Sequence, residues 1–306
     1  MDVLTDILRT VQLKSAVYFQ KDFCGNWGMD VAQGPFAQFH LVLDGECSLE
    51  VEEQTIRLQK GDIVVFPTGT PHLLQSETGI SCQSGMKVVQ TIMQGAPIFD
   101  KGAVSTRLVC GHFELDQLDR HPFFQSLPSV IHLPENDLHQ TQLEPIVSVI
   151  LAETAAPQHG SSLVVNRLAE VLLIHIFRSY LQQATAVQGY LGALTDRPVY
   201  QALQLIHQTP EKPWTLAQLA QQAGVSRTSL ATRFKSLVGL PPMSYMTEWR
   251  MIKAREKLSN GSTPIGIVAE EVGYRSEAAF NRVFKRTFQQ TPGAFRRTNK
   301  QLAQLS

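Results

Sequence analysis

The chain has 306 residues, of which 43% are hydrophobic and 18% charged, and its formal net charge is zero. These values are typical of a globular protein of two domains and exclude a disordered or fibrous chain. No apolar run reaches 18 residues, and the first residues, 1–6, lack the basic start and apolar core of a signal peptide. We therefore expect a cytoplasmic protein that does not contact a membrane.

Charge is unevenly divided along the chain. Residues 196–306 hold 16 Lys and Arg against 7 Asp and Glu, a net charge of +9, so residues 1–195 hold 11 against 20, a net charge of −9. A basic half attracts the phosphates of nucleic acid, whereas an acidic half repels them. The carboxy-terminal part is therefore predicted to carry any contact with DNA.

Short alternating segments between Val17 and about residue 115 predict strands of a small barrel or sandwich, at 39–43, 48–51, 54–58, 63–66 and 107–115. Asp44-Gly45 and Lys60-Gly61-Asp62 are turn signals between them. The stretch from Gly61 to His72 fits the second cupin motif, G-x5-P-x-G-x2-H, at every fixed position. Together with H-L-V-L-D-G-E at 40–46, it resembles a cupin-type sensor domain.

Metal-binding cupins take two His and one Glu from the first motif and one His from the second. Here Gln38 stands at the Glu position, and the expected upstream His positions hold none, so that only His72 remains. One imidazole does not hold a metal ion. We expect no metal, no cofactor and no catalytic residue. His40 and His72 either line a ligand pocket or are hydrogen-bonded barrel residues.

Helical spacing returns after the barrel. Residues 121–128 and 130–134 are expected to form a loop and a last extended segment, and residues 138–153 and 161–183 to form two helices, the second capped by Ser161 or Ser162. The expected domains are 1–186 for the sensor, with the barrel at about 15–135 and helices at about 138–183, then a linker at 187–197 and a second domain at 198–300. Residues 199–207 should form the first helix of that second domain.

Two matching patterns fill residues 214–297. Each has a short amphipathic helix, a turn containing Gly224 or Gly273, and a second helix that begins at Ser226 or Ser276. Glycine takes the positive φ of such a turn, and a serine hydroxyl can cap the helix that follows. These are the features of two helix-turn-helix motifs in tandem. The inward positions of the second helices are expected to be Leu230, Phe234, Leu237, Phe280, Val283, Phe284 and Phe288.

The outward faces of the two second helices carry small, polar and basic residues, which suit a major groove about 12 Å wide. They are Arg227, Thr228, Ala231, Thr232 and Lys235 in the first, and Glu277, Ala278, Asn281, Arg282 and Lys285 in the second. A single motif of this kind would be read as a solvated surface; two with matching turns favour DNA binding.

Residues 214–297 resemble the DNA-binding domain of the AraC/XylS family of transcription regulators. The long signature of its second motif is matched by Ile265, Ala269, Val272, Gly273, Tyr274, Ser276, Phe280, Phe284, Lys285, Phe288, Thr291, Pro292 and Arg296. The resemblance implies a linker helix at 242–259 and both recognition helices in successive major grooves. By position, the base-facing residues are Thr228, Ala231, Thr232, Glu277, Ala278 and Arg282. Ala231 is a departure among these positions, because its methyl group can contact only a thymine methyl or no base at all.

The resemblance implies an α+β protein: an amino-terminal cupin-like β-barrel with a flanking helix pair, and a carboxy-terminal all-α domain of two helix-turn-helix motifs. In the family, the helix pair forms a homodimer contact; alternatively, it covers its own barrel. We expect a transcription activator that binds promoter DNA and contacts RNA polymerase. The alternatives are a cupin metalloenzyme fused to a DNA-binding domain, and a constitutive DNA-binding protein whose barrel serves only dimerisation.

Two classes of signal remain open for the sensor domain. A small effector would occupy the barrel interior, whereas an oxidant would act on thiols. The subgroup that this chain resembles includes regulators of the response to reactive chlorine, and Cys24 and Cys110 stand where cysteines occur there. His112 is expected on the same strand face as Cys110, where it would lower the thiol pKa if the two side chains lie close together. A Cys24–Cys110 disulfide requires Cα atoms within about 7 Å.

Overall fold

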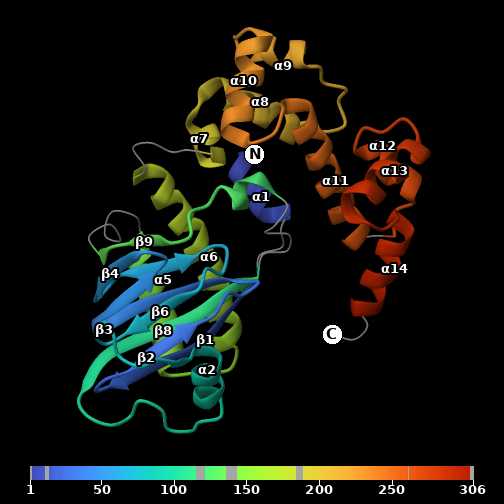
Figure 1. Ribbon diagram of the computed structural model, residues 1–306. Helices are drawn as coiled ribbons and strands as arrows, with labels where there is room; N and C mark the ends of the chain where they lie inside the picture. Colours follow the sequence, from blue (N-terminus) through green and yellow to red (C-terminus); the bar gives the residue numbers. More distant parts are fainter. Residues whose placement is uncertain are drawn as a thin grey trace. The chain divides into compact units, whose positions relative to one another are not determined.

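The computed structural model describes residues 2–10, 14–114, 121–135, 143–183, 189–260 and 262–303. The chain divides into two compact units (Figure 1). One unit comprises residues 12–187, and the other comprises residues 188–306 together with residues 1–11. No helix within the described part of the chain is long and apolar enough to span a membrane.

The first unit is built on a nine-stranded sheet that curls over an apolar core. Its path of paired strands runs β1-β8-β3-β6-β2-β7, with β4 and β5 also paired to β3, and β9 paired to β5. The strands are β1 (Lys14–Cys24), β2 (Gly28–Val31), β3 (Ala37–Val51), β4 (Gln54–Gln59), β5 (Ile63–Phe66), β6 (His72–Gln75), β7 (Gln83–Ser84), β8 (Val104–Glu114) and β9 (Ile131–Leu133). The strand expected near 130–134 is β9.

Strand β3 runs through both layers of the curled sheet. Its first half pairs with β5 and β8, and its second half pairs with β4 and β6. The prediction of a turn at Asp44-Gly45 was wrong, because the chain continues as a strand with a register shift between Val42 and Asp44. Gly45 has φ +74°, and a Cβ there would lie 2.0 Å from the carbonyl oxygen of Ser105. The glycine therefore serves the bend of the strand.

In the described residues of this unit, four helices accompany the sheet. Helix α2 (Gly85–Met93) lies against β1 and β2, and α5 (Leu143–Ala155) packs on α6 (Ser161–Gln183), which contacts β1. The segment expected to be a loop at 121–128 contains a short helix, α3 (Pro122–Gln125), whose first turn is capped by the side chain of His121. Of the helix expected at 138–153, residues 138–142 lie outside the described residues, and α5 covers the rest.

The second unit is entirely helical in its described residues. Its helices are α1 (Val3–Thr10), α7 (Gly189–Thr195), α8 (Arg197–Gln208), α9 (Leu216–Gln222), α10 (Arg227–Val238), α11 (Pro242–Asn260), α12 (Ile265–Glu271), α13 (Glu277–Phe288) and α14 (Pro292–Ala303). The helices expected at 199–207 and 242–259 correspond to α8 and α11. The stretch 187–197 was expected to be a linker, but it holds α7, in which Tyr190 and Leu191 are buried.

Helix α1 belongs to the helical unit, although the sequence placed residues 1–186 in the sensor domain. Its apolar side chains Val3, Ile7 and Leu8 are buried, and the helix packs on α8 and α11. Burial of these side chains removes apolar surface from water, and each Å² of that surface contributes about 25 cal/mol of favourable free energy. This burial explains why so short a helix docks. The spacing of positions 3, 7 and 8 is that of one helix face.

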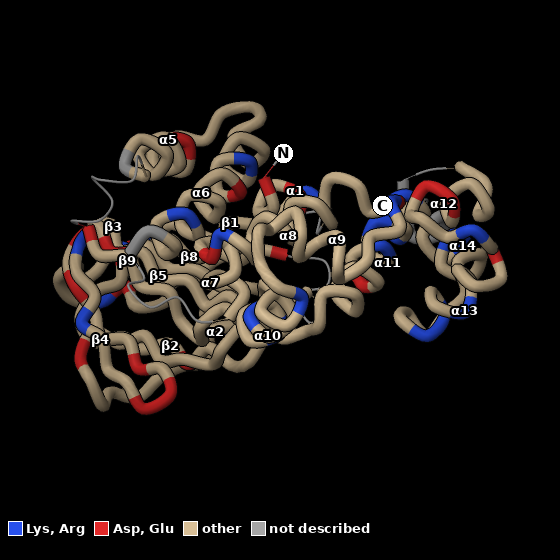
Figure 2. Tube along the Cα trace, turned by 90° about the horizontal axis from the view of Figure 1, so that it is seen from above, with Lys and Arg blue, Asp and Glu red and all other residues tan. Residues whose placement is uncertain are grey.

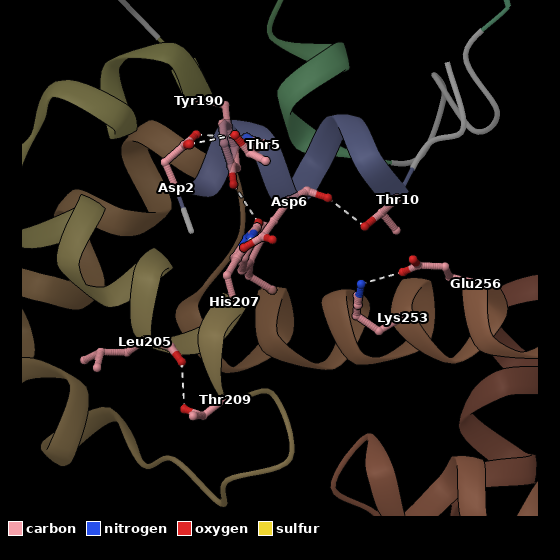
Figure 3. A network of polar contacts seen from close by, with 11 residues as sticks. Asp2, Thr5, Asp6, Thr10, Tyr190, Leu205, His207, Thr209, Lys253 and Glu256 are labelled. Atoms are coloured by element: carbon pink, nitrogen blue, oxygen red, sulfur yellow. Dashed lines mark hydrogen bonds and ion pairs between the residues drawn. The ribbon is translucent and has the colours of Figure 1, made fainter. Parts of the chain in front are cut away.

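A polar network lies beneath α1 (Figure 3). The carboxylate of Asp6 is 3.7 Å from Nδ1 of His207 on α8. Nε2 of His207 is 2.7 Å from the hydroxyl of Tyr245, which is 2.6 Å from the hydroxyl of Tyr190. Burial lowers the pKa of His207, while Asp6 acts in the opposite direction. Nε2 of His207 thus has a hydrogen-bond partner beneath α1, whereas its buried Nδ1 has only the more distant carboxylate of Asp6.

We predict that Ile7→Ala weakens the docking of α1. Ile7 has no exposed surface, and removal of a buried isoleucine side chain costs about 2–5 kcal/mol. The amides of α8 and α11 should then exchange with solvent faster, as measured by hydrogen exchange and mass spectrometry. Arg9→Ala on the exposed face of α1 is the control. Equal exchange in both variants and the wild type would show that α1 does not stabilise this unit.

Candidate DNA interface and sensor centre

The first helix-turn-helix motif consists of α9 and α10. Thr215 and Gln218 form a reciprocal capping box at the start of α9, and Gly224 takes φ +67° in the turn. The hydroxyl of Ser226 accepts a hydrogen bond from the amide of Ser229 at 3.1 Å, so that α10 begins at Arg227. These contacts confirm the predicted turn and cap.

The second motif consists of α12 and α13 and repeats this geometry. Gly273 takes φ +85°, and the hydroxyl of Ser276 accepts a hydrogen bond from the amide of Ala279 at 3.4 Å. A core of apolar side chains from α11 to α14 holds α13 in place, with Phe280 and Phe284 buried at its centre. The tandem repeat in the sequence therefore corresponds to two structurally equivalent motifs.

The inward faces follow the prediction, with one shift. Leu230, Phe234, Phe280, Phe284 and Phe288 are buried, whereas Leu237 is only half-buried and Val238 takes the buried position. Val283 is also half-buried. Position 238 follows 230 and 234 at the i+4 spacing that keeps side chains on one helix face, which explains the shift.

The outward faces are accessible to a ligand. The exposed members of the predicted set are Arg227, Thr228, Thr232, Lys235, Glu277, Ala278, Arg282 and Lys285, while Ala231 and Asn281 are half-buried. Lys and Arg recur along α10, α13 and α14, whereas acidic residues are spread over the strands, turns and helices of the other unit (Figure 2). The positive charge thus accompanies the two recognition helices.

Three of the five predicted sensor residues meet inside the sheet unit. His40 on β3, His72 at the start of β6 and Cys110 on β8 are all buried. Nδ1 of His40 is 2.9 Å from Sγ of Cys110, and Nε2 of His40 is 2.9 Å from Nε2 of His72. Nδ1 of His72 is 2.8 Å from the carbonyl oxygen of Thr70. We call His40, His72 and Cys110 the thiol–imidazole cluster.

The hydrogen bonds fix the proton positions of the thiol–imidazole cluster. The carbonyl of Thr70 can only accept, so Nδ1 of His72 donates and its Nε2 has a free lone pair. Nε2 of His40 then donates to His72, which leaves Nδ1 of His40 to accept the proton of the Cys110 thiol. Burial, together with the neighbouring His72, holds the pKa of His40 well below its usual value, and burial lowers the pKa of His72 to about 4. Both rings are therefore neutral near pH 7.

The thiol of Cys110 is protonated in this arrangement. Burial raises its pKa well above the usual value, with Cys47 acting in the same direction. The imidazole in contact with this thiol is that of His40 and not that of His112, so the expected effect of His112 on the thiol pKa does not apply. His112 instead lies against the tilted rings of Tyr18 and Phe36 and is 3.3 Å from Glu114. Identifying His40 as the partner requires knowing that β3 pairs with β8, because His40 lies 70 residues from Cys110 in the sequence.

Cys24 lies apart from the cluster and is half-buried. In the pairing of β1 with β8, Cys110 stands opposite Phe19, and Cys24 is five residues further along β1. At about 3.3 Å per residue, this separates the two cysteines by about 16 Å, well beyond the roughly 7 Å that a disulfide spans. A Cys24–Cys110 bridge within this fold is therefore excluded.

The cluster does not have the donor set of a metal-binding cupin. Gln38 occupies the position where those proteins carry Glu, and its amide is a poor substitute for a carboxylate. Within the described part of the chain, no group of three or more His, Cys, Asp and Glu side chains is placed to hold a metal ion. In the cluster, Cys110 and His72 contact opposite nitrogens of His40 rather than converging on one point.

Comparisons with known proteins agree with both halves of this structure. Residues 2–182 match the family described as Cupin, and residues 219–298 match a helix-turn-helix domain. An AraC-like transcription regulator of Streptomyces antibioticus is 32% identical over 97% of this chain and 99% of its own. The RCS-specific activator RclR of Escherichia coli is 26% identical over 87% of this chain and 86% of its own.

Among solved structures, an AraC-type regulator of Chromobacterium violaceum is 28% identical and covers 35% of this chain and 96% of its own, with a TM-score of 0.34. The fold and the two motifs define a regulator with a cupin-like domain and a helix-turn-helix DNA-binding domain. The chain belongs to the AraC-like family of transcription regulators.

Proposed function

We propose that α10 and α13 dock in successive major grooves, about 34 Å apart on one face of promoter DNA. The observation that carries this proposal is the repeat of turn, cap and exposed face in two motifs of one basic unit. The base-facing residues would be Thr228 and Thr232 on α10, and Glu277, Ala278 and Arg282 on α13. Arg227, Lys235, Asn281 and Lys285 would contact phosphates or neighbouring bases. Ala231, half-buried and apolar, would contribute little.

We predict that Arg282→Ala costs about 1–3 kcal/mol of binding and relaxes specificity at one base pair, because a guanidinium can donate to both O6 and N7 of guanine. Sequencing of DNA fragments retained by the purified protein would reveal the site, and titration with that site would give the affinity. Arg233→Ala is the control, because Arg233 is ion-paired with Asp196. An unchanged affinity and base preference in Arg282→Ala would remove Arg282 from the interface.

We propose that the helix pair of the sheet unit, α5 and α6, forms the contact of a homodimer. Helix α6 exposes Leu163, Val164 and Val171 on one side, and α5 exposes Val149. These side chains lie on a helix pair whose other side already packs on β1, so covering the barrel does not account for them. A second copy of this chain would cover them and bring two DNA-binding units to one promoter.

We predict that Val171→Arg shifts the protein toward monomer, because it places a charge in the apolar contact. Sedimentation analysis over a range of concentrations measures the shift. Val104→Arg makes the same substitution at another exposed valine, on β8, and should leave the association unchanged. Identical sedimentation of both variants and the wild type would place the dimer contact elsewhere.

For the signal, we propose an oxidant that acts on thiols of the sheet unit. Apolar side chains face the interior of the sheet, among them Phe23, Trp27 and Phe66, and Cys110 belongs to this core. There the thiol is in contact with a hydrogen-bond acceptor, Nδ1 of His40, which favours a thiol-based signal. The relative RclR is named as an RCS-specific activator. Together with the resemblance to regulators of the response to reactive chlorine, this favours hypochlorous acid as the oxidant.

Oxidation of the Cys110 thiol by hypochlorous acid would proceed in two steps. The sulfur of Cys110 would attack the chlorine of hypochlorous acid and break the Cl–O bond, and the thiol proton, which is hydrogen-bonded to Nδ1 of His40, would pass to the departing hydroxide to give water. Hydrolysis of the sulfur–chlorine bond gives a sulfenic acid, so that thiol and hypochlorous acid yield sulfenic acid, chloride and a proton. A polar sulfenic acid in the apolar core would disturb the packing of β3 on β8. Cys24, which is more accessible, would react independently rather than as a disulfide partner.

We predict that the promoter response to hypochlorite is lost in Cys110→Ser and reduced in Cys24→Ser. Output from a reporter gene in exposed cells measures the response. Cys47→Ser is the matched control, because Cys47 is equally buried in the same apolar core, whereas it is Cys110 that contacts the imidazole of His40. An equal response in wild type, Cys24→Ser and Cys110→Ser would end the thiol hypothesis and favour a small effector.

The remaining parts of the proposal follow from the family. Relatives named as transcription regulators and activators support a protein that activates transcription through RNA polymerase in the cytoplasm and is not an enzyme. A constitutive DNA-binding protein would bind its site equally with and without oxidant, which the same DNA titration distinguishes.

A further inference from the structure

Arg250 on α11 reaches the segment that leads into the first helix-turn-helix motif. Its Nε donates to the carbonyl oxygen of Pro210 at 2.6 Å, and its Nη2 donates to the carbonyl oxygen of Lys212 at 2.9 Å. Two donors held in one rigid plane are a property of the guanidinium group, which lysine cannot reproduce. Arg250 therefore fixes the backbone just before Thr215, where the first motif begins.

The same guanidinium lies against the turn of the second motif. Its Cζ is 5.9 Å from the ring centre of Tyr274, and a Cβ on Gly273 would lie 2.8 Å from its Nη2 and 2.7 Å from the carbonyl oxygen of Glu211. The glycine thus permits this close contact, because any side chain at position 273 would push Arg250 and the backbone of Glu211 away from the turn. Tyr274 in turn packs against Phe280 in the first turn of α13, with ring centres 5.7 Å apart.

We infer that Arg250 is a positioning residue that sets the separation and angle of the two recognition helices, and thereby the spacing of the two DNA segments that the protein accepts. The inference rests on the proposed docking of both helices. The segment 210–213 lies directly before the cap of α9, and Gly273 and Tyr274 lie directly before the cap of α13. A rigid link between these two points makes simultaneous docking favourable at one spacing and unfavourable at others.

The test uses the full chain and a duplex that the wild-type protein retains, together with versions that carry one or two base pairs inserted between the two protected segments. Each insertion rotates one segment by about 34°, because a turn of DNA holds about 10.5 base pairs. Wild type should discriminate strongly against the insertions. In Arg250→Lys, the ratio of affinities for native and altered spacing should fall about fivefold or more, which is the lower range of ordinary coupling between two sites.

Lys257→Ala and Arg250→Ala form a charge-matched pair for comparison. Lys257 pairs with Glu271 at 2.7 Å and so links α11 to α12, but it does not contact residues 210–213. Lys257→Ala should keep the wild-type spacing preference, and Arg250→Ala should lose it. Thermal unfolding shows whether each variant is folded, and Arg250→Lys keeps the charge if Arg250→Ala is not.

Three outcomes would overturn the inference in different ways. Wild type that tolerates the insertions would contradict docking of both helices as well as the role of Arg250. Wild type that discriminates, with Arg250→Lys discriminating equally, would overturn the role of Arg250 alone. A loss of affinity that is the same at all spacings, with a smaller dependence on salt, would instead make Arg250 a phosphate contact.

Discussion

The burial of α11 on two sides is the interaction on which the DNA-binding unit depends. Near its start, Tyr245 and Trp249 are buried, and His207 of α8 stacks on Trp249 with ring centres 3.8 Å apart. Further along, Met251, Ala254 and Leu258 belong to the core shared with α12, α13 and α14. One helix thus supplies apolar surface to both motifs, and the recognition helices take their orientation from it.

Much of this unit was predictable because its determinants are local. Gly224, Gly273, Ser226 and Ser276 act within a few residues of their own position, so the turns, the caps and the exposed faces can be read from the sequence. The sheet was less predictable. Asp44-Gly45 has the composition of a turn, yet pairing with β8 across 60 residues keeps β3 continuous, and no local pattern records such a partner.

The sensor centre shows the same division. The sequence indicated Cys110, His40 and His72 as separate candidates, but it did not indicate that His40 contacts both of the others, nor that Cys24 lies on a distant part of β1. Strand register decides both points. The direction of the Cys110 pKa also depended on burial, which overrides the effect expected from a nearby imidazole when the whole cluster lies in an apolar core.

The position of α1 has a consequence for how the protein can be handled. Residues 1–11 fold with residues 188–306, so the helical unit is not a contiguous piece of the chain. A carboxy-terminal fragment made for work with DNA would leave the surfaces of α8 and α11 that receive Val3, Ile7 and Leu8 open to water, with a tendency to self-associate. A DNA-binding protein made from this unit would therefore need α1 as well as the carboxy-terminal helices.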